Sequence, residues 1–177
     1  MSTDQLEILM RALAFAADKH KNQRRKDPEA SPYINHPITL AGILVAEGQI
    51  TDLETICGAL LHDTIEDTET TEAELANAFG TVIARIVMEV SDDQRLPKPE
   101  RKKAQITHAP ALSTRARAVK LADKIANLRD VADCPPRDWS LERRRAYYDW
   151  AKQVIDGLRG SYPDLEAVFD RQYAQRP

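Results

Sequence analysis

Cysteines and aromatic residues are scarce in this sequence. It has two cysteines, Cys57 and Cys134, and only 6% of its 177 residues are aromatic. Two cysteines cannot form the dense disulfide scaffold of small secreted domains, so we expect a reducing compartment, the cytoplasm. The few aromatic residues show no interleaved basic pattern, which disfavours nucleic acid as a partner.

Long hydrophobic runs and an excess of positive charge are also missing. No segment approaches the roughly 20 apolar residues of a membrane span, and the N-terminal segment carries Asp4 and Glu7 where a secretory signal would be basic and apolar. We therefore expect no membrane partner. The formal net charge is −3, so any binding of anions must depend on local clusters of basic residues.

A helical hydrophobic period runs along nearly the whole chain. The segment TVIARIVMEV, residues 81–90, is rich in β-branched residues, but its apolar positions repeat at helical spacing and we interpret it as a helix. The helices expected from period and capping residues cover residues 3–20, 38–46, 53–62, 71–80, 81–90, 100–108, 113–132, 140–159 and 164–173. The sequence therefore predicts an all-α, single-domain helical bundle over residues 1–177.

The segment LLHDTIEDTE places one histidine and four carboxylates directly after an apolar helix. His62 and Asp63 could be a solvated pair that ends this helix. The acids that follow could belong to the first turn of the next helix, where the helix dipole favours negative charge, and for Glu69 we accept that interpretation. Glu66 and Asp67 could instead orient or deprotonate a water molecule beside a metal ion.

Two further positions add to this segment. His36 lies at the start of an expected helix, where a lone histidine is more often a hydrogen-bonded loop residue than a ligand. Asp123, Asn127 and Asp130 form one narrow stripe of the helix VKLADKIANLRD. Apolar residues flank Asp123, and an unpaired buried carboxylate is costly, so Asp123 needs a partner. A neighbouring lysine could be that partner, although it projects towards another side.

Two histidines and two aspartates form a chemically sensible set of metal ligands. This candidate set is His36, His62, Asp63 and Asp123. Imidazole with carboxylate suits Mn²⁺, Fe²⁺ or Zn²⁺, and the lack of paired cysteines counts against a structural zinc site. Four protein ligands on a six-coordinate ion would leave positions for water and a phosphate oxygen. The other histidines, His20 and His108, lie in charged segments and are expected to be exposed and uninvolved.

Three motifs occur in the order YINHPI, LLHDTIEDT and VKLADKIANLRD. Together they resemble the motifs of HD-domain hydrolases of the RelA/SpoT type. The resemblance extends to RRKDPE, LPKPERKK and YYDWA, and so covers nearly the whole chain. We expect no synthetase or regulatory region after the last motif. The chain is thus similar to the stand-alone small alarmone hydrolases of the metazoan SpoT-homologue type.

The resemblance implies a role for each matching residue. It implies that one Mn²⁺-type ion is bound by His36, His62, Asp63 and Asp123. It implies that water is activated and positioned by Glu66 and Asp67. It implies that the nucleotide is bound by Arg25, Lys26, Asn127 and Tyr147.

The same resemblance implies a substrate. Enzymes of this type remove the 3′-pyrophosphate of ppGpp and pppGpp, giving GDP or GTP and pyrophosphate. Some small relatives act on the 2′-phosphate of NADPH, and others act on adenosine alarmones. A rival from another class is a nucleotide sensor without hydrolytic activity, which the intact pair Glu66 and Asp67 disfavours. Monomer and homodimer both stay open.

Local clusters of basic residues independently favour a highly phosphorylated small molecule. They lie at residues 24–26, 98–103 and 143–145, and Arg and Lys side chains bind phosphates through charge-assisted hydrogen bonds. Each cluster could instead be a solvated helix face. For Lys98, Arg101 and Lys102 we favour contact with the substrate, because two prolines restrict the segment that presents them, and we assign Lys98 and Arg101 to the substrate.

Overall fold

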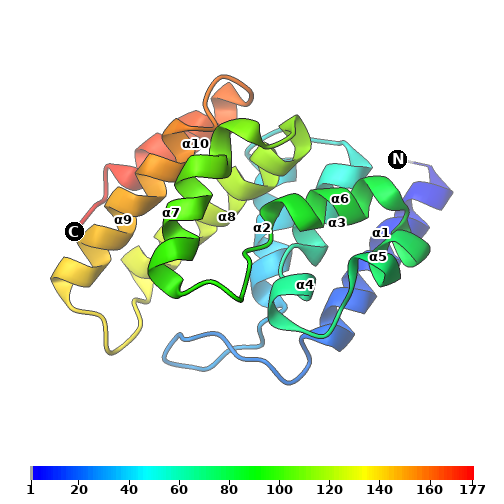
Figure 1. The fold of residues 1–177 in the computed structure, drawn as a ribbon, viewed down its shortest axis with the longest axis horizontal. Coiled ribbons are helices and arrows are strands. Elements are labelled where there is room, and N and C mark those ends of the chain that lie inside the picture. Colours follow the sequence, from blue (N-terminus) through cyan, green and yellow to red (C-terminus); the bar gives the residue numbers. More distant parts are fainter. Residues whose placement is uncertain (1) are drawn as a thin grey trace.

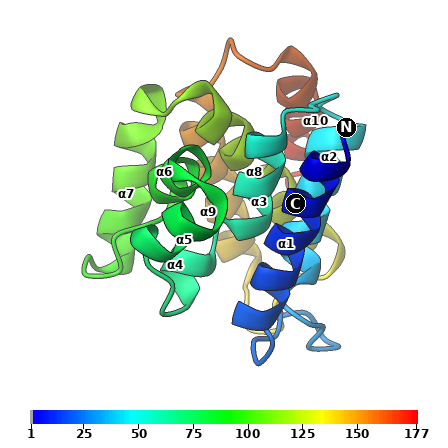
Figure 2. The same cartoon turned by 90° about the vertical axis from the view of Figure 1, so that its right-hand side faces the viewer.

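The computed structural model describes residues 2–177 (Figures 1 and 2). Within this range the chain forms ten α-helices and one 3₁₀-helix, with no strand, so the expected all-α fold is confirmed. The helices are α1 (Thr3–Lys19), α2 (Asn35–Ala46), α3 (Leu53–Leu61), α4 (Thr64–Asp67), α5 (Glu72–Phe79), α6 (Thr81–Val90), α7 (Lys98–His108), η1 (Ala109–Ala111), α8 (Thr114–Asp133), α9 (Leu141–Asp156) and α10 (Pro163–Tyr173).

Helix α8 is the central element of the bundle. It contacts α2, α3, α6, α9 and α10, and it lies in the middle of the molecule in Figure 1. Its residues Leu121, Ile125 and Leu128, on the side opposite the polar stripe of Asp123, Asn127 and Asp130, are fully buried. Because α8 is packed on nearly every side, the direction of a polar side chain on it is well defined.

Helix α3 packs against α1, α2, α6 and α8. Gly58 allows its close approach to α6, since a Cβ atom at this position would lie 2.6 Å from the side chain of Ile86. The connections α1–α2, α6–α7 and α8–α9 lie along one long edge of the molecule, the lower edge in Figure 1. The functional candidates gather at this edge.

Several helix ends differ from the expected ones. Helix α2 begins at Asn35, earlier than Ile38, because Pro37 fits a first turn in which its missing N–H is not needed. Helix α7 begins at Lys98 for the same reason, since a proline again occupies its first turn. Helix α9 ends at Asp156, before the expected residue 159.

The turn α4 was not predicted as a separate helix. Helix α3 ends before His62. The hydroxyl of Thr64 donates to the carbonyl of Leu61 at 2.7 Å and so satisfies a carbonyl that has no partner within the helix after the break. Glu66 and Asp67 therefore lie on their own helical turn and not in the first turn of α5. Among the described residues, no helix has both the length and the apolar composition needed to cross a bilayer.

Candidate active site

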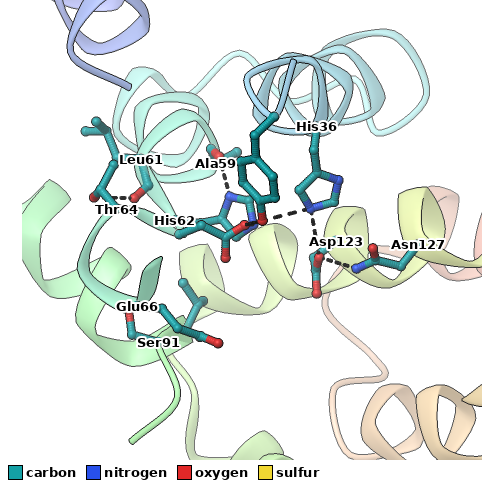
Figure 3. A network of polar contacts seen from close by, with 12 residues as sticks. His36, Ala59, Leu61, His62, Thr64, Glu66, Ser91, Asp123 and Asn127 are labelled. Atoms are coloured by element: carbon teal, nitrogen blue, oxygen red, sulfur yellow. Dashed lines mark hydrogen bonds and ion pairs between the residues drawn. The ribbon is translucent and has the colours of Figure 1, made fainter. Parts of the chain in front are cut away.

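Three of the four candidate metal ligands, His36, His62 and Asp123, converge from three helices (Figure 3), and Asp63 follows His62 directly. His36 lies in the first turn of α2, His62 and Asp63 follow the end of α3, and Asp123 lies on α8. The Nε2 atom of His36 is 3.3 Å from Asp123 Oδ1 and 4.0 Å from Asp63 Oδ2. His62 Nε2 is 2.8 Å from Asp63 Oδ2. Donor atoms of His36, His62 and Asp123 all lie within 4.8 Å of one another.

His36, His62 and Asp123 lie close enough together to hold one divalent ion, and Asp63, beside His62, lies outside this group of three. Ligand atoms about 2.1 Å from an octahedral ion lie about 3 Å apart when adjacent and about 4.2 Å apart when opposite. The atom His62 Nε2 supports this interpretation further. It is buried and makes no hydrogen bond, although an oxygen of Asp63 lies nearby. The other ring nitrogen, Nδ1, lies 2.9 Å from the carbonyl of Ala59 and must donate to it, so Nε2 of the neutral ring is free to bind a metal.

The electrostatics of this cluster also favour a cation. Burial alone would lower the pKa of His62, but the carboxylates of Asp63 and Asp123 outweigh burial and raise it. Burial alone would raise the pKa of Asp63, but His62 and His36 hold it well below its usual range. The cluster therefore stabilises positive charge between its carboxylates, and a divalent ion would supply that charge.

Asp123 is held by two neighbours on its own helix. Asn127 Nδ2 donates to Asp123 Oδ1 at 2.6 Å, and Lys124 Nζ is 3.0 Å from Oδ2. The lysine pairing left open above therefore exists, although Lys124 was expected to project elsewhere. Burial alone would raise the pKa of Asp123, but Lys124 and His36 outweigh burial and hold this pKa well below its usual range. The ion pair occupies Oδ2, so Oδ1 still faces His36.

Tyr33 is a further residue of the site. Its hydroxyl donates a short hydrogen bond to Asp63 Oδ2, and its ring centroid lies 6.0 Å from that of His36. Burial and the charge of Asp63 raise the pKa of Tyr33, so the hydroxyl stays a donor. The available signal was its position in YINHPI, three residues before a candidate ligand.

His20 contradicts its expected exposure. Only 1% of its surface is accessible, and its ring packs 4.9 Å from the ring of Tyr33. The charged neighbours Lys19 and Lys21 misled the prediction, because adjacent residues at a helix end point in different directions. His20 Nδ1 lies 2.7 Å from Gln23 Oε1, and Gln23 Nε2 donates to the carbonyl of Asp67 at 2.7 Å. The α1–α2 connection is thereby tied to α4. His108 is exposed, as expected.

Glu66 and Asp67 lie on α4, beside the ligand cluster. Glu66 Oε2 accepts a hydrogen bond from the backbone N–H of Asp92 at 2.9 Å. Burial raises the pKa of Glu66 to about 7, the range in which a carboxylate acts as a general base near neutral pH. Desolvation, and then the charge of Asp63, also raise the pKa of Asp67.

A cavity of about 280 Å³ lies next to the cluster. Four predicted substrate residues line it: Arg25, Lys26, Asn127 and Tyr147. Arg25 pairs with Asp130 and lies 5.6 Å from the ring centroid of Tyr33. Because Asn127 lines the cavity and also donates to Asp123, one side chain joins the cavity to the ligand cluster.

The two other predicted substrate residues do not line this cavity. Lys98 is exposed at the start of α7, and Arg101 donates to Gln94 and lines a different cavity. Lys102, on the same helix, has its Nζ atom 5.6 Å from the ring centroid of Tyr147, a residue that lines this cavity. Lys102 was favoured together with Lys98 and Arg101. Which of these side chains faces the cavity depends on the rotation of α7, which its basic sequence does not reveal.

The chain is similar to several known proteins. The family model described as HD domain matches residues 12–151. The chain is 51% identical to guanosine-3′,5′-bis(diphosphate) 3′-pyrophosphohydrolase MESH1 of Danio rerio, over 99% of this chain and 98% of that protein. It is also 51% identical to the protein of the same name from Homo sapiens, over 95% and 94%. A solved structure, described as a metazoan ortholog of SpoT that hydrolyses ppGpp, superposes with a TM-score of 0.93 at 46% identity, covering 96% of this chain and 95% of that one.

Proposed function

We propose that this chain, which belongs to the HD-domain family, hydrolyses the 3′-pyrophosphate of ppGpp and pppGpp to give GDP or GTP and pyrophosphate. The observation that carries the proposal is the 51% identity, over nearly the full length of both chains, to relatives named for this reaction. Three features of the site support the proposal: a group of His36, His62 and Asp123 that could hold a metal ion, a carboxylate with a pKa of about 7, and an adjoining basic cavity.

The ligands that we propose for one divalent ion are His36, His62, Asp63 and Asp123. Mixed imidazole and carboxylate ligands suit Mn²⁺, which we propose as the ion, and also suit Fe²⁺ and Zn²⁺. When bound, the ion would lower the pKa of a coordinated water and polarise the phosphoryl group. Tyr33 orients Asp63 and Asn127 orients Asp123, so both carboxylates have fixed directions before an ion arrives.

Glu66 is the residue that we propose as the general base. Water attacks the phosphorus next to the ribose 3′ oxygen and gives a proton to Glu66. The bond from that phosphorus to the 3′ oxygen breaks, the 3′ oxygen takes up a proton, and pyrophosphate leaves. Asp67, one residue further along α4, holds the attacking water in line.

The nucleotide lies in the cavity lined by Arg25, Lys26, Asn127 and Tyr147. The two basic side chains bind phosphate oxygens and stabilise the charge that develops as the bond breaks. Tyr147 and the neighbouring Trp139, with ring centroids 5.4 Å apart, offer apolar surface to the base. The substrate is a small nucleotide and not a polymer, and the cytoplasm is the compartment that we propose.

Two predicted substrate residues have an indirect role in this proposal. Burial lowers the pKa of Lys102, and the positive charge of Lys98 lowers it further, so the two charges act on the same region. Lys98 and Lys102 therefore both add positive electrostatic potential there. Arg101 lies one turn from Lys98 on the same helix and adds to that potential.

A comparison of substrates tests this function. Purified protein with Mn²⁺ is assayed against ppGpp, pppGpp, their adenosine counterparts and NADPH, and kcat/KM is determined for each. We expect the guanosine alarmones to give the highest kcat/KM. A higher value for NADPH would move the assignment to removal of its 2′-phosphate. Binding of ppGpp without turnover would indicate a sensor.

A further inference from the structure

The direction of the Glu66 carboxylate depends on one backbone group. Within residues 2–177, the N–H of Asp92 is the only protein group that donates a hydrogen bond to Glu66, and it does so at 2.9 Å. Asp92 belongs to the α6–α7 connection, residues 91–97, which passes beside α4 (Figure 3). Any movement of this connection would therefore move the donor away from Glu66.

Gln105 on α7 holds Asp92 in place. Its Nε2 atom donates to both carboxylate oxygens of Asp92, at 2.9 Å each. Because a carboxylate only accepts, the amide must present its NH₂ group to Asp92, and its Oε1 atom is left buried without a partner. An unpaired buried acceptor destabilises the folded protein, and leucine at this position would avoid that cost. The contact with Asp92 is what the polar side chain contributes.

A second residue holds the same segment from the other side. Lys120 on α8 is only 8% exposed, and its Nζ atom donates to the carbonyl of Val90 at 2.8 Å. Helix α7 is itself fixed to α9, since Trp150 Nε1 donates to the carbonyl of Lys102 at 3.0 Å. Residues 90–92 are thus held between two anchored helices.

Gln105 does not contact the place proposed for the nucleotide. It lines a separate cavity of about 270 Å³, together with Asp92, Arg101 and Lys120. This cavity and the nucleotide cavity have no lining residue in common. A change at Gln105 can therefore affect Glu66 without removing a contact to the base or the sugar.

We propose that Gln105 is a positioning residue for Glu66, acting through the carboxylate and backbone N–H of Asp92. This inference rests on the role of Glu66 in the function proposed above. Loss of the Gln105 side-chain amide frees the α6–α7 connection, so that Glu66 loses its donor and its fixed direction. The metal ligands and the nucleotide cavity keep their structure.

Kinetics of Gln105→Leu give the first test. We expect kcat for ppGpp to fall about tenfold, with KM and bound Mn²⁺ unchanged. This fall corresponds to a rise of about 1.4 kcal/mol in the activation free energy. The matched control is Gln153→Leu, because Gln153 is exposed on α9 and bonds only to a carbonyl of its own helix. An unchanged kcat in Gln105→Leu, or an equal loss in Gln153→Leu, would overturn the proposal.

Variants of Asp92 separate positioning from general damage to the fold. Asp92→Asn keeps the backbone N–H and an oxygen that accepts from Gln105, so we expect kcat near that of the wild type. Asp92→Ala loses the acceptor and should match Gln105→Leu. In a Glu66→Gln background, Gln105→Leu should add little further loss, since both changes act on one group. A full tenfold loss in that background would refute action through Glu66.

Hydrogen exchange at the Asp92 amide tests the inference without turnover. We expect this amide to exchange faster in Gln105→Leu than in the wild type and in Gln153→Leu. Unchanged exchange at Asp92 would overturn the positioning role even if the wild type is active. If the wild type hydrolyses none of the nucleotides, the proposed function fails, while faster exchange in Gln105→Leu still supports the structural link.

Discussion

Glu66→Gln tests the proposed base most sharply. The amide keeps an oxygen that can accept from the N–H of Asp92, so we expect the fold, the bound metal and KM to stay close to those of the wild type. This amide cannot accept a proton from water. General-base catalysis contributes roughly 10²–10⁴-fold in rate, so kcat should fall by about that factor.

The pH dependence of the wild type follows from the same residue. Glu66 must be deprotonated to act, so kcat falls as the pH drops through its pKa. Burial raises this pKa from 4.5 to about 7, and a bound cation would move it back towards the lower value. We therefore expect the acidic limb of the profile between pH 4.5 and 7, with kcat falling about tenfold per pH unit below it.

The assay is the release of pyrophosphate from ppGpp at saturating substrate and Mn²⁺, from pH 4.5 to 8.5, for the wild type and Glu66→Gln. Bound metal is measured in parallel, so that loss of the ion at low pH is not mistaken for protonation of Glu66. In Glu66→Gln the acidic limb should disappear. A variant with the wild-type kcat, or with the same limb at low activity, would refute the assignment of Glu66 as the base.

Three other substitutions test separate parts of the site. Asp63→Ala should lose bound Mn²⁺ and turnover together, as measured by elemental analysis and product release; hydrolysis at the wild-type rate without metal would remove Asp63 from the ligand set. Tyr33→Phe deletes the donor to Asp63 and should weaken metal affinity about 10–100-fold in a metal titration, while the protein stays folded; unchanged affinity would limit Tyr33 to packing. Lys102→Met should raise KM for ppGpp several-fold with little change in kcat. The control Lys152→Met, at an exposed ion pair with Asp156, should change neither KM nor kcat. Equal effects of the two changes would rule out a local role for Lys102.

The parts of the site that the sequence predicted are those that depend on helical period. Asp123 and Asn127 were placed on one stripe of a helix, and the structure shows them hydrogen-bonded there. Leu121, on the opposite side of α8, is fully buried. Helical spacing alone determines the side of a helix on which each side chain lies, so these placements do not depend on neighbouring helices.

The parts that were missed depend on contacts between distant segments. His20 is buried by the ring of Tyr33, which arrives from a later part of the α1–α2 connection. Glu66 receives its hydrogen bond from the backbone of Asp92, and a backbone donor has no signature in the side-chain sequence. The break between α3 and α4 depends on a local hydroxyl contact of Thr64, which hydrophobic period does not encode.

Hydrolysis of ppGpp in ¹⁸O-labelled water tests the central claim most directly. Attack of water on the phosphorus next to the 3′ oxygen places one labelled oxygen in pyrophosphate and none in GDP. We predict this distribution for the wild type with Mn²⁺, and no products when the ion is removed by a chelator. Label at the ribose 3′ oxygen of GDP, or failure to release pyrophosphate in the presence of the ion, would contradict the account.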